Sequence, residues 1–288
     1  MIKILQGNCL DKLKELPDQS INTCITSPPY WGLRDYGEDK QLGMEDTPEE
    51  FVNNLVEVFR EVKRVLRDDG TVWLNLGDTF LPNKQLGCIP FKVAMALQQD
   101  GFYLRQDIIW HKPNPMPESV KDRCTKAHEY IFLLSKSPKY YFDNEAIKED
   151  AKFPDGPNTP KSIKAVDGVY SKNLQKIGAN PKRNKRSVWI VTTKPSFKGA
   201  HFATFPMDLI EPCVLAGCPE NGTVLDPFGG SGTTGIVASN HNRKAVLIEL
   251  NAEYIEIARQ RIQDQGGLFT DLEIVSGDSK VLNGDSRV

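Results

Sequence analysis

Blocks of apolar and polar residues alternate along the first 135 residues and predict strands and helices in turn. The clearest helix covers residues 48–67, where apolar side chains recur at helical spacing. Thr47 is suited to cap this helix and Pro48 to begin it, Glu50 completes a capping box, and we expect Gly70 to end it. Shorter runs predict a second helix at 90–99 and strands at 2–5, 21–26, 71–76, 103–110 and 129–134.

The same alternation returns near the C-terminus. It predicts a helix at 206–216, a strand at 223–225, a glycine-rich turn with a helix, a strand at 244–250, and a helix at 252–264 capped by Asn251. Alternating strands and helices favour an α/β fold, with a mostly parallel, doubly wound sheet that is covered on both faces. The last segment, 266–288, could add an edge strand or lack regular structure.

Composition narrows the class of protein. With 288 residues and 39% apolar side chains the chain can build a large core. The six cysteines are scattered and form no CxxC pair, so neither a disulfide framework nor a structural zinc or other metal is expected. The chain has no apolar run of about 20 residues and its start lacks a signal-peptide pattern. We therefore expect a cytoplasmic protein with no membrane span.

Charge is unevenly distributed, although the formal net charge is only −2. Residues 143–200 contain 12 Lys and Arg against 6 acids, which makes this segment +6 and the remainder −8. The segment is rich in Lys, Asn, Pro and Gly without a sustained period, so a loop-rich basic insert is expected. Such an insert indicates either a surface for a polyanion or simply a solvated loop.

The first candidate site is the glycine-rich turn DPFGGSGTT at residues 226–234. Glycines let the backbone approach a nucleoside ligand closely, and Glu249, at the end of the next strand, could bind ribose hydroxyls. A tight turn without any ligand would show similar glycines. Asp226 precedes the turn and would repel a pyrophosphate, but it suits a positively charged cofactor such as S-adenosylmethionine. About 60 residues follow, too few for a second dinucleotide-binding half, which argues against a nicotinamide dehydrogenase.

The second candidate site is TSPPYW at residues 26–31, after a predicted strand. Two prolines hold the chain extended and leave carbonyl oxygens without a ladder partner. A planar group with an exocyclic amine could donate to Ser27 and to a backbone carbonyl while it stacks on Tyr30. The alternative is a proline-stiffened turn whose aromatic side chains pack in the core.

Together the two motifs resemble the DNA amino-methyltransferases that modify cytosine N4 or adenine N6. The catalytic motif precedes the cofactor motif and a basic segment separates them, which resembles the β-class order of that family. The resemblance implies a circularly permuted SAM-dependent methyltransferase fold, with a catalytic domain over 1–142 and 200–265, a target-recognition insert over 143–199 and an extension over 266–288. It also covers the segments GTVWLNLGD, IIWHKPNPMP, HEYIFLLSKSPKYYFD and HFATFPMDLIEPCV.

The resemblance implies a role for each matching residue. The catalytic loop would be Ser27, Pro28, Pro29 and Tyr30. The binding site for S-adenosylmethionine would consist of Asp226, Phe228, Gly229, Gly230, Ser231, Gly232, Thr233, Glu249, Phe205, Pro206 and Asn8. The family usually has an acid where this chain has Asn8, so hydrogen bonding rather than an ionic contact is expected there. Candidate DNA contacts are Trp31, Asn114, Lys182, Arg183, Lys185 and Arg186, although simple solvation would also explain the basic run.

The expected activity is methyl transfer to an exocyclic amine of a base flipped out of double-stranded DNA. Family members with Ser before Pro-Pro-Tyr mostly modify cytosine N4, so Ser27 favours cytosine N4 over adenine N6. A cognate restriction endonuclease is a possible partner, and the oligomeric state is open. The alternatives are a SAM-dependent RNA or protein amine methyltransferase and a non-enzymatic DNA-binding module. The order of the motifs and the basic insert argue against an RNA or protein methyltransferase. The presence of both intact loops argues against a DNA-binding module without activity.

Overall fold

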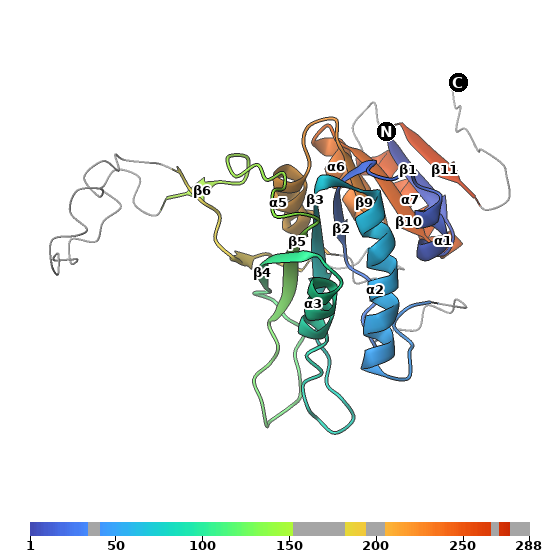
Figure 1. The fold of residues 1–288 in the computed structure, drawn as a ribbon. Coiled ribbons are helices and arrows are strands. Elements are labelled where there is room, and N and C mark those ends of the chain that lie inside the picture. Colours follow the sequence, from blue (N-terminus) through green and yellow to red (C-terminus); the bar gives the residue numbers. More distant parts are fainter. Residues whose placement is uncertain (34–40, 152–181, 194–204, 266–270, 277–288) are drawn as a thin grey trace. The chain divides into compact units, whose positions relative to one another are not determined.

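The computed structural model describes residues 1–33, 41–151, 182–193, 205–265 and 271–276. The chain forms two compact units, one from residues 1–142 and 187–288 and the other from residues 143–186. In the described residues the first unit contains a nine-stranded sheet in the order β11-β1-β10-β9-β2-β3-β5-β4-β8 (Figure 1). The strands are β1 Ile2–Gln6, β2 Ile21–Thr26, β3 Leu66–Leu76, β4 Tyr103–His111, β5 His128–Ser135, β8 Val188–Ile190, β9 Thr223–Asp226, β10 Lys244–Glu249 and β11 Leu272–Val275.

The sheet is mostly parallel, as expected. Each neighbouring pair from β11 to β3 is parallel, and so is the pair β4 and β8. Only β5 runs the other way, antiparallel to β3 and to β4. The mostly parallel sheet is therefore confirmed, while the reversal of β5 is a feature that hydrophobic periodicity does not encode.

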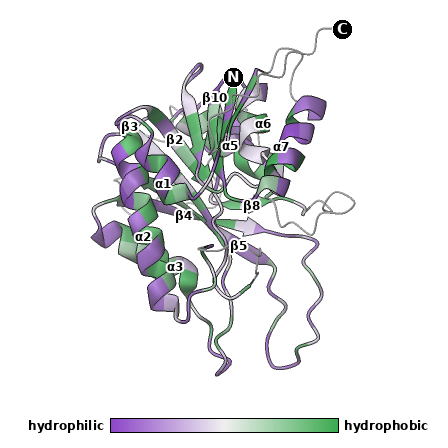
Figure 2. Cartoon of the chain, turned by 90° about the vertical axis from the view of Figure 1, so that its right-hand side faces the viewer, coloured by the Kyte–Doolittle hydropathy of each residue, from purple (hydrophilic) through white to green (hydrophobic). Residues whose placement is uncertain are grey.

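Helices cover the sheet on both faces. They are α1 Cys9–Lys14, α2 Pro48–Val65, α3 Ile89–Gln99, α5 Met207–Gly217, α6 Thr233–Asn240 and α7 Ala252–Gln265. Figure 2 shows α1, α2 and α3 on one side of the strands and α5, α6 and α7 on the other. Apolar side chains of α1, α2 and α3 form one buried cluster with side chains of the central strands. This arrangement confirms the doubly wound α/β fold.

The capping box of α2 forms as predicted, but the end of the helix differs. The Glu50 N–H donates to Thr47 Oγ1 at 3.2 Å, and the Thr47 N–H donates to Glu50 Oε2 at 3.3 Å. The prediction that Gly70 ends the helix is wrong, because α2 ends at Val65 and Leu66 is already extended. Leu66 is fully buried and pairs with Ile21 of β2, so sheet pairing ends the helix before the glycine is reached.

Part of the expected insert over 143–199 joins the main sheet near its C-terminal end. Residues 188–190 form β8, which pairs with β4 at the edge of the main sheet. Trp189 is buried there and its ring lies 6.4 Å from that of Trp73. The apolar indole thus draws this stretch into the sheet of the first unit. Residues 152–181 and 194–199 of the expected insert lie outside the described residues.

Two further segments form short strands. In the second unit, β6 Glu149–Asp150 pairs antiparallel with β7 Lys182–Arg183. At the C-terminus, residues 272–275 add an edge strand beside β1, one of the two outcomes expected for the tail. None of the helices in the described ranges has the length and apolar character needed to cross a membrane.

Candidate active site

The two loops predicted to carry the chemistry leave neighbouring strands of the sheet. β9 and β2 lie side by side and run parallel, so the turn after Asp226 and the loop after Thr26 meet at one edge. From β9 the chain continues through α6 to β10, and from β2 it continues through α2 to β3 in the opposite direction along the sheet. This is a topological switch point, where ligands bind in doubly wound folds.

Asp226 joins the two loops beneath this edge. Its Oδ1 accepts from Thr26 Oγ1 at 2.6 Å and from the Phe228 N–H at 3.1 Å, and its Oδ2 accepts from Thr234 Oγ1 at 2.6 Å. The side chain is only 2% exposed, and burial raises the pKa of this carboxyl to about 6 although all three hydrogen bonds oppose the rise. The carboxylate therefore holds the turn in shape from below, rather than lying on its open side.

The glycine turn lies close against the neighbouring strand β10. The Gly229 N–H donates to the Ile248 carbonyl at 2.8 Å, and a Cβ on Gly229 would lie 2.9 Å from the Leu247 Cβ. Gly230 and Gly232 have φ of +48° and +80°, which side chains rarely allow. Gly232 is the N-cap residue of α6, and Thr233 begins that helix. Glycines at these positions are therefore required by the backbone itself.

Glu249 at the end of β10 lies beside the turn. Its Oε2 accepts from the Gly230 N–H at 2.8 Å and its Oε1 from the Asn251 N–H at 2.9 Å. Burial raises the pKa of this carboxyl. Glu249 is half-buried, and its main-chain carbonyl accepts from the Gly7 N–H at 2.9 Å, which brings the turn after β1 to the same place.

The remaining predicted cofactor residues are Asn8, Phe205, Pro206 and Phe228, and they are buried or half-buried. Asn8 caps α1, because its Oδ1 accepts from the Leu10 N–H at 2.9 Å. Pro206 is buried at the N-cap of α5, and Phe205 and Phe228 are half-buried. Pro206 and Phe205 thus precede the helix that leads into β9.

Arg261 is a residue of this region that the sequence did not reveal. From α7, its Nη1 donates to the Ser231 carbonyl at 2.6 Å, to Ser231 Oγ and to Thr233 Oγ1 at 3.1 Å. Burial lowers the pKa of this guanidinium. The sequence did contain one indication of this residue. On a helix Arg261 lies beside the apolar residues Ala258 and Ile262, so a cation was to be expected at the edge of the buried face of α7.

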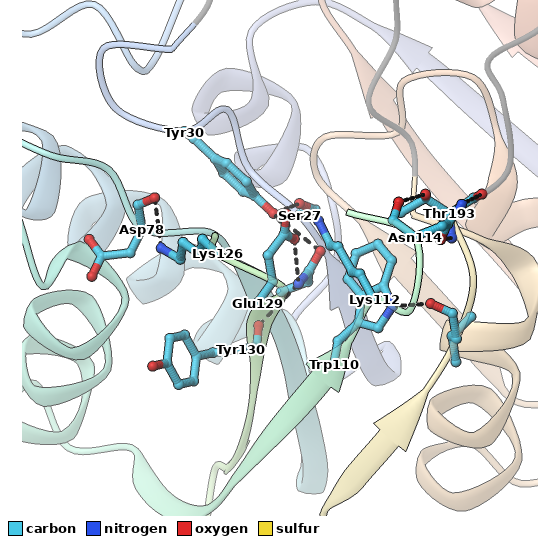
Figure 3. A network of polar contacts seen from close by, with 12 residues as sticks. Ser27, Tyr30, Asp78, Trp110, Lys112, Asn114, Lys126, Glu129, Tyr130 and Thr193 are labelled. Carbon is cyan, nitrogen blue, oxygen red and sulfur yellow. Dashed lines mark hydrogen bonds and ion pairs between the residues drawn. The ribbon is translucent and has the colours of Figure 1, made fainter. Parts of the chain in front are cut away.

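Tyr30 of the Ser27–Tyr30 loop forms polar contacts with side chains of two strands, β3 and β5 (Figure 3). Ser27 Oγ lies 3.4 Å from Tyr30 Oη, and Tyr30 Oη donates to Glu129 Oε2 at 2.8 Å. Pro28 is buried, while Pro29 is half-buried. The Tyr30 ring rests on Gly77 at the end of β3, where a Cβ would lie 2.5 Å from Tyr30 Cε2. Burial and the charge of Glu129 raise the pKa of the Tyr30 hydroxyl well above its ordinary value.

Three partners of Tyr30 and Glu129 escaped the sequence prediction. Tyr30 contacts Asn75 on β3 and Glu129 on β5. Glu129 also forms an ion pair with Lys112, which lies just after β4. The available signal was the segment HEYIFLLS, whose polar start precedes an apolar strand. Glu129 reaches Tyr30 only because β5 lies between β3 and β4, and this strand order cannot be read from the segment itself.

The predicted DNA contacts on the first unit have partners within the chain. Trp31 is half-buried and its Nε1 donates to the Glu45 carbonyl at 2.9 Å, so the indole anchors its own loop. Asn114 Nδ2 donates to the Thr193 carbonyl at 3.0 Å, and Asn114 Oδ1 accepts from the Thr193 N–H at 3.0 Å. Trp31 packs against the buried core, as the alternative interpretation of TSPPYW expects, and Asn114 has an anchoring role that the sequence prediction did not include.

In the second unit the basic run faces acids. Lys182 pairs with Asp150 at 2.7 Å, and Glu149 pairs with both Arg183 at 2.9 Å and Arg186 at 2.6 Å. Acids therefore neutralise part of the charge of this run, although Lys182 and Arg186 remain exposed. Lys185 belongs to the same run and is half-buried.

The chain is similar to known proteins along most of its length. The chain is similar to the type II methyltransferase M.Cfr9I of Citrobacter freundii, with 45% identity over 91% of this chain and 88% of that protein. It is 43% identical to M.SmaI of Serratia marcescens, over 90% of each chain.

Two solved structures share the fold. One is the PvuII DNA methyltransferase described as cytosine-N4-specific, with a TM-score of 0.69 and 22% identity over 93% of this chain and 86% of that one. The other is TTHA0409, a putative DNA modification methylase of Thermus thermophilus complexed with S-adenosylmethionine, with a TM-score of 0.69 and 24% identity over 97% of this chain and all of that one. The family model described as DNA methylase, of the N6 and N4 methyltransferases, matches residues 21–260. With close relatives along nine-tenths of its length and this family match, the chain belongs to the N6/N4 DNA methylase family.

Proposed function

We propose that this DNA methylase methylates the exocyclic N4 of a cytosine that is flipped out of double-stranded DNA. The observation that carries the proposal is the meeting of two loops at the switch point between β9 and β2, joined by the hydrogen bond from Thr26 to Asp226. One loop offers a polar edge at Ser27, and the other offers the glycine turn. A methyl donor and an amine need to meet at such a junction.

The cofactor is S-adenosylmethionine, which when bound supplies an electrophilic methyl group. The residues present suit it, because Asp226 and Glu249 place two carboxyl groups beneath and beside a glycine turn, and a cation is favoured there. A Cβ on Gly230 would meet only the Phe228 carbonyl, at 3.9 Å, so the turn is open on that side. Gly229, Gly230, Ser231, Gly232, Thr233 and Phe228 would hold the methionine end, Glu249 the ribose, and Phe205, Pro206 and Asn8 the surrounding wall.

The task of the chain is to make a poor nucleophile reactive. The lone pair of an exocyclic amine is delocalised into the base, so the nitrogen attacks poorly. Hydrogen bonds from the amine to Ser27 Oγ and to the Pro28 carbonyl favour a pyramidal nitrogen whose lone pair is available for attack. The extra proton leaves after transfer. Positioning and electrostatics supply the rate, and no covalent enzyme intermediate is needed.

Base flipping gives the target access to this loop at a cost of a few kcal/mol. Stacking on the Tyr30 ring offsets about 1–3 kcal/mol of this cost, by analogy with single-strand platforms. Phosphate contacts from Lys182, Arg183, Lys185 and Arg186 would add salt-dependent affinity. Trp31 and Asn114 would contribute mainly by holding their loops in place.

Cytosine N4 is preferred over adenine N6 because a Ser precedes the Pro-Pro-Tyr of this chain. The fold relative PvuII, described as cytosine-N4-specific, supports the same choice. Type II methyltransferases among the relatives also make a paired restriction endonuclease of the same target site the expected partner.

The deciding experiment exposes unmethylated plasmid DNA to the protein and S-adenosylmethionine, then identifies the modified nucleoside by mass spectrometry and maps it by sequencing. We expect N4-methylcytosine at a single sequence motif. N6-methyladenine alone would overturn the choice of base, and label entering only RNA or protein would overturn DNA as substrate. In the Ser27→Ala variant we expect transfer to be abolished or greatly slowed while cofactor affinity is retained.

A further inference from the structure

Glu129 lies at the centre of a hydrogen-bonded chain that ends at Ser27. Lys112 Nζ pairs with Glu129 Oε1, and Glu129 Oε2 accepts from Tyr30 Oη at 2.8 Å. Tyr30 Oη in turn lies 3.4 Å from Ser27 Oγ (Figure 3). The Lys112 and Glu129 side chains are only 18% and 16% exposed, so this ion pair is largely shielded from water. The loop proposed to hold the target amine is thus connected to a charged pair on β5 and just after β4.

The position of the Tyr30 hydroxyl proton determines which groups donate and which accept along these hydrogen bonds. Tyr30 Oη carries one proton and has two acceptors in reach, Glu129 Oε2 at 2.8 Å and Asn75 Oδ1 at 3.3 Å. Hydrogen bonds to an ionised carboxylate are shorter and stronger than neutral ones, so the proton points at Glu129. The lone pairs of Tyr30 Oη are then free to accept the Ser27 hydroxyl proton. Ser27 Oγ is left to act as an acceptor.

An acceptor at Ser27 is what the target amine requires, since the amine donates its protons to the loop and keeps its lone pair for attack. If the phenol instead donated to Ser27, the Ser27 proton would point toward the amine and repel it. The orientation of one hydroxyl therefore determines whether Ser27 can hold the substrate.

Lys112 and Gly77 keep this arrangement in place. Lys112 Nζ lies 4.2 Å from the centroid of the Trp110 ring, which fixes the ammonium beside Glu129. Asn75 Nδ2 donates to the Tyr130 carbonyl at 3.0 Å and also faces Glu129 Oε2 at 3.4 Å. The lack of a side chain at Gly77 gives the Tyr30 ring its seat.

We propose that Glu129, paired with Lys112, is a positioning residue for methyl transfer: it orients the Tyr30 hydroxyl so that Ser27 Oγ accepts from the target amine. The inference rests on the proposed function, because it assigns a role within the same site. It adds two charged residues, from β5 and the segment after β4, that neither of the two loop motifs contains.

The test compares Glu129→Gln with the unaltered protein in single-turnover methyl transfer. Gln keeps the shape, but an amide that turns its oxygen toward Lys112 presents its N–H₂ to Tyr30. The Tyr30 hydroxyl then accepts from the Gln side chain and donates its own proton to Ser27. The direction of both hydrogen bonds is thereby reversed. We expect transfer to slow by about 100-fold, as for loss of one preorganised hydrogen bond, while affinities for S-adenosylmethionine and DNA stay within about threefold.

Two companion variants separate positioning from simple support of the fold. Glu61→Gln breaks another half-buried ion pair, with Arg64 on α2, and should leave transfer unchanged. Glu129→Asp keeps the charge and should recover at least about tenfold of the activity that Gln loses. Thermal unfolding of each variant identifies any that fails to fold.

The double variant gives the sharpest result. If Glu129 acts through the phenol, adding Glu129→Gln to Tyr30→Phe should slow transfer by less than about threefold more. Losses that multiply in the double variant, or full activity in Glu129→Gln, would overturn the inference. These outcomes are distinct from failure of the proposed function, in which the unaltered protein itself would not methylate cytosine in DNA.

Discussion

Thr26 Oγ1 and Asp226 Oδ1 lie 2.6 Å apart, although 200 residues separate them in the sequence. Thr26 is the last residue of β2 and Asp226 the last residue of β9, and both side chains are buried. The hydrogen bond thus ties the start of the Ser27–Tyr30 loop to the start of the glycine turn. In the proposed function this hydrogen bond sets the relative position of amine and methyl donor, because it joins two loops that the sequence shows only as separate motifs.

Removing the tie tests its importance. Thr26→Val keeps the volume but leaves the buried Asp226 carboxyl without one of its donors. We expect the free energy of unfolding to fall by about 1–3 kcal/mol and methyl transfer to slow. Urea unfolding and single-turnover rates measure both effects. Thr26→Ser, which restores the hydroxyl, should stay near the unaltered protein, and an equal loss in both variants would argue against a role for the hydrogen bond.

The raised pKa of Asp226 predicts a particular pH dependence of stability. Its folded-state pKa of about 6 lies above the ordinary value of 3.8, so between these limits only the folded chain keeps the proton. The contribution of Asp226 is therefore greatest below about pH 4 and is lost as pH rises through about 6, a change of about 3 kcal/mol. Comparing urea unfolding of the unaltered protein and Asp226→Asn isolates this carboxyl, because the other acids are common to both. A difference that stays constant from pH 4 to pH 8 would contradict the prediction.

Arg261 should matter for the cofactor rather than for DNA. Arg261→Met removes the donors that bind Ser231 and Thr233 but keeps the apolar length of the side chain. We expect the affinity for S-adenosylmethionine to fall by about tenfold, equivalent to about 1.4 kcal/mol, with DNA affinity unchanged. Arg259→Met is the matched control, since Arg259 lies on the same helix and its ion pair is with Glu256. Equal losses in both variants would indicate a general effect on α7.

In the second unit, Glu149 competes with any polyanion for two arginines. It pairs with both Arg183 and Arg186, so Glu149→Gln should leave them available to phosphates. We expect tighter DNA binding and a salt dependence steeper by about one to two units in the plot of log K against log salt. Filter binding or anisotropy at several salt concentrations measures both. Weaker binding in Glu149→Gln would show that the acid is needed to hold the basic run in a DNA-binding form.

Hydrophobic periodicity was enough to locate most of the longer helices and strands, because burial on one face imposes a local repeat. The helix after Thr47, the strand ending at Thr26 and the strand starting at Thr223 lie where the pattern predicts. The pattern did not predict the element boundaries that depend on contacts with residues distant in the sequence. The pairing of Leu66 with Ile21 ends α2 before Gly70, and the burial of Trp189 makes a strand inside the expected insert.

By itself the sequence determined the class of fold and both loop motifs, since glycines at positive φ and consecutive prolines restrict the backbone wherever they occur. Only the tertiary structure decided which side chains surround those loops. Glu129 reaches Tyr30 because β5 inserts between β3 and β4, and Arg261 reaches Ser231 because α7 packs beside the turn. Such contacts join residues tens to hundreds of positions apart, and their geometry depends on the order of strands in the sheet. A local pattern of residues carries no record of that order.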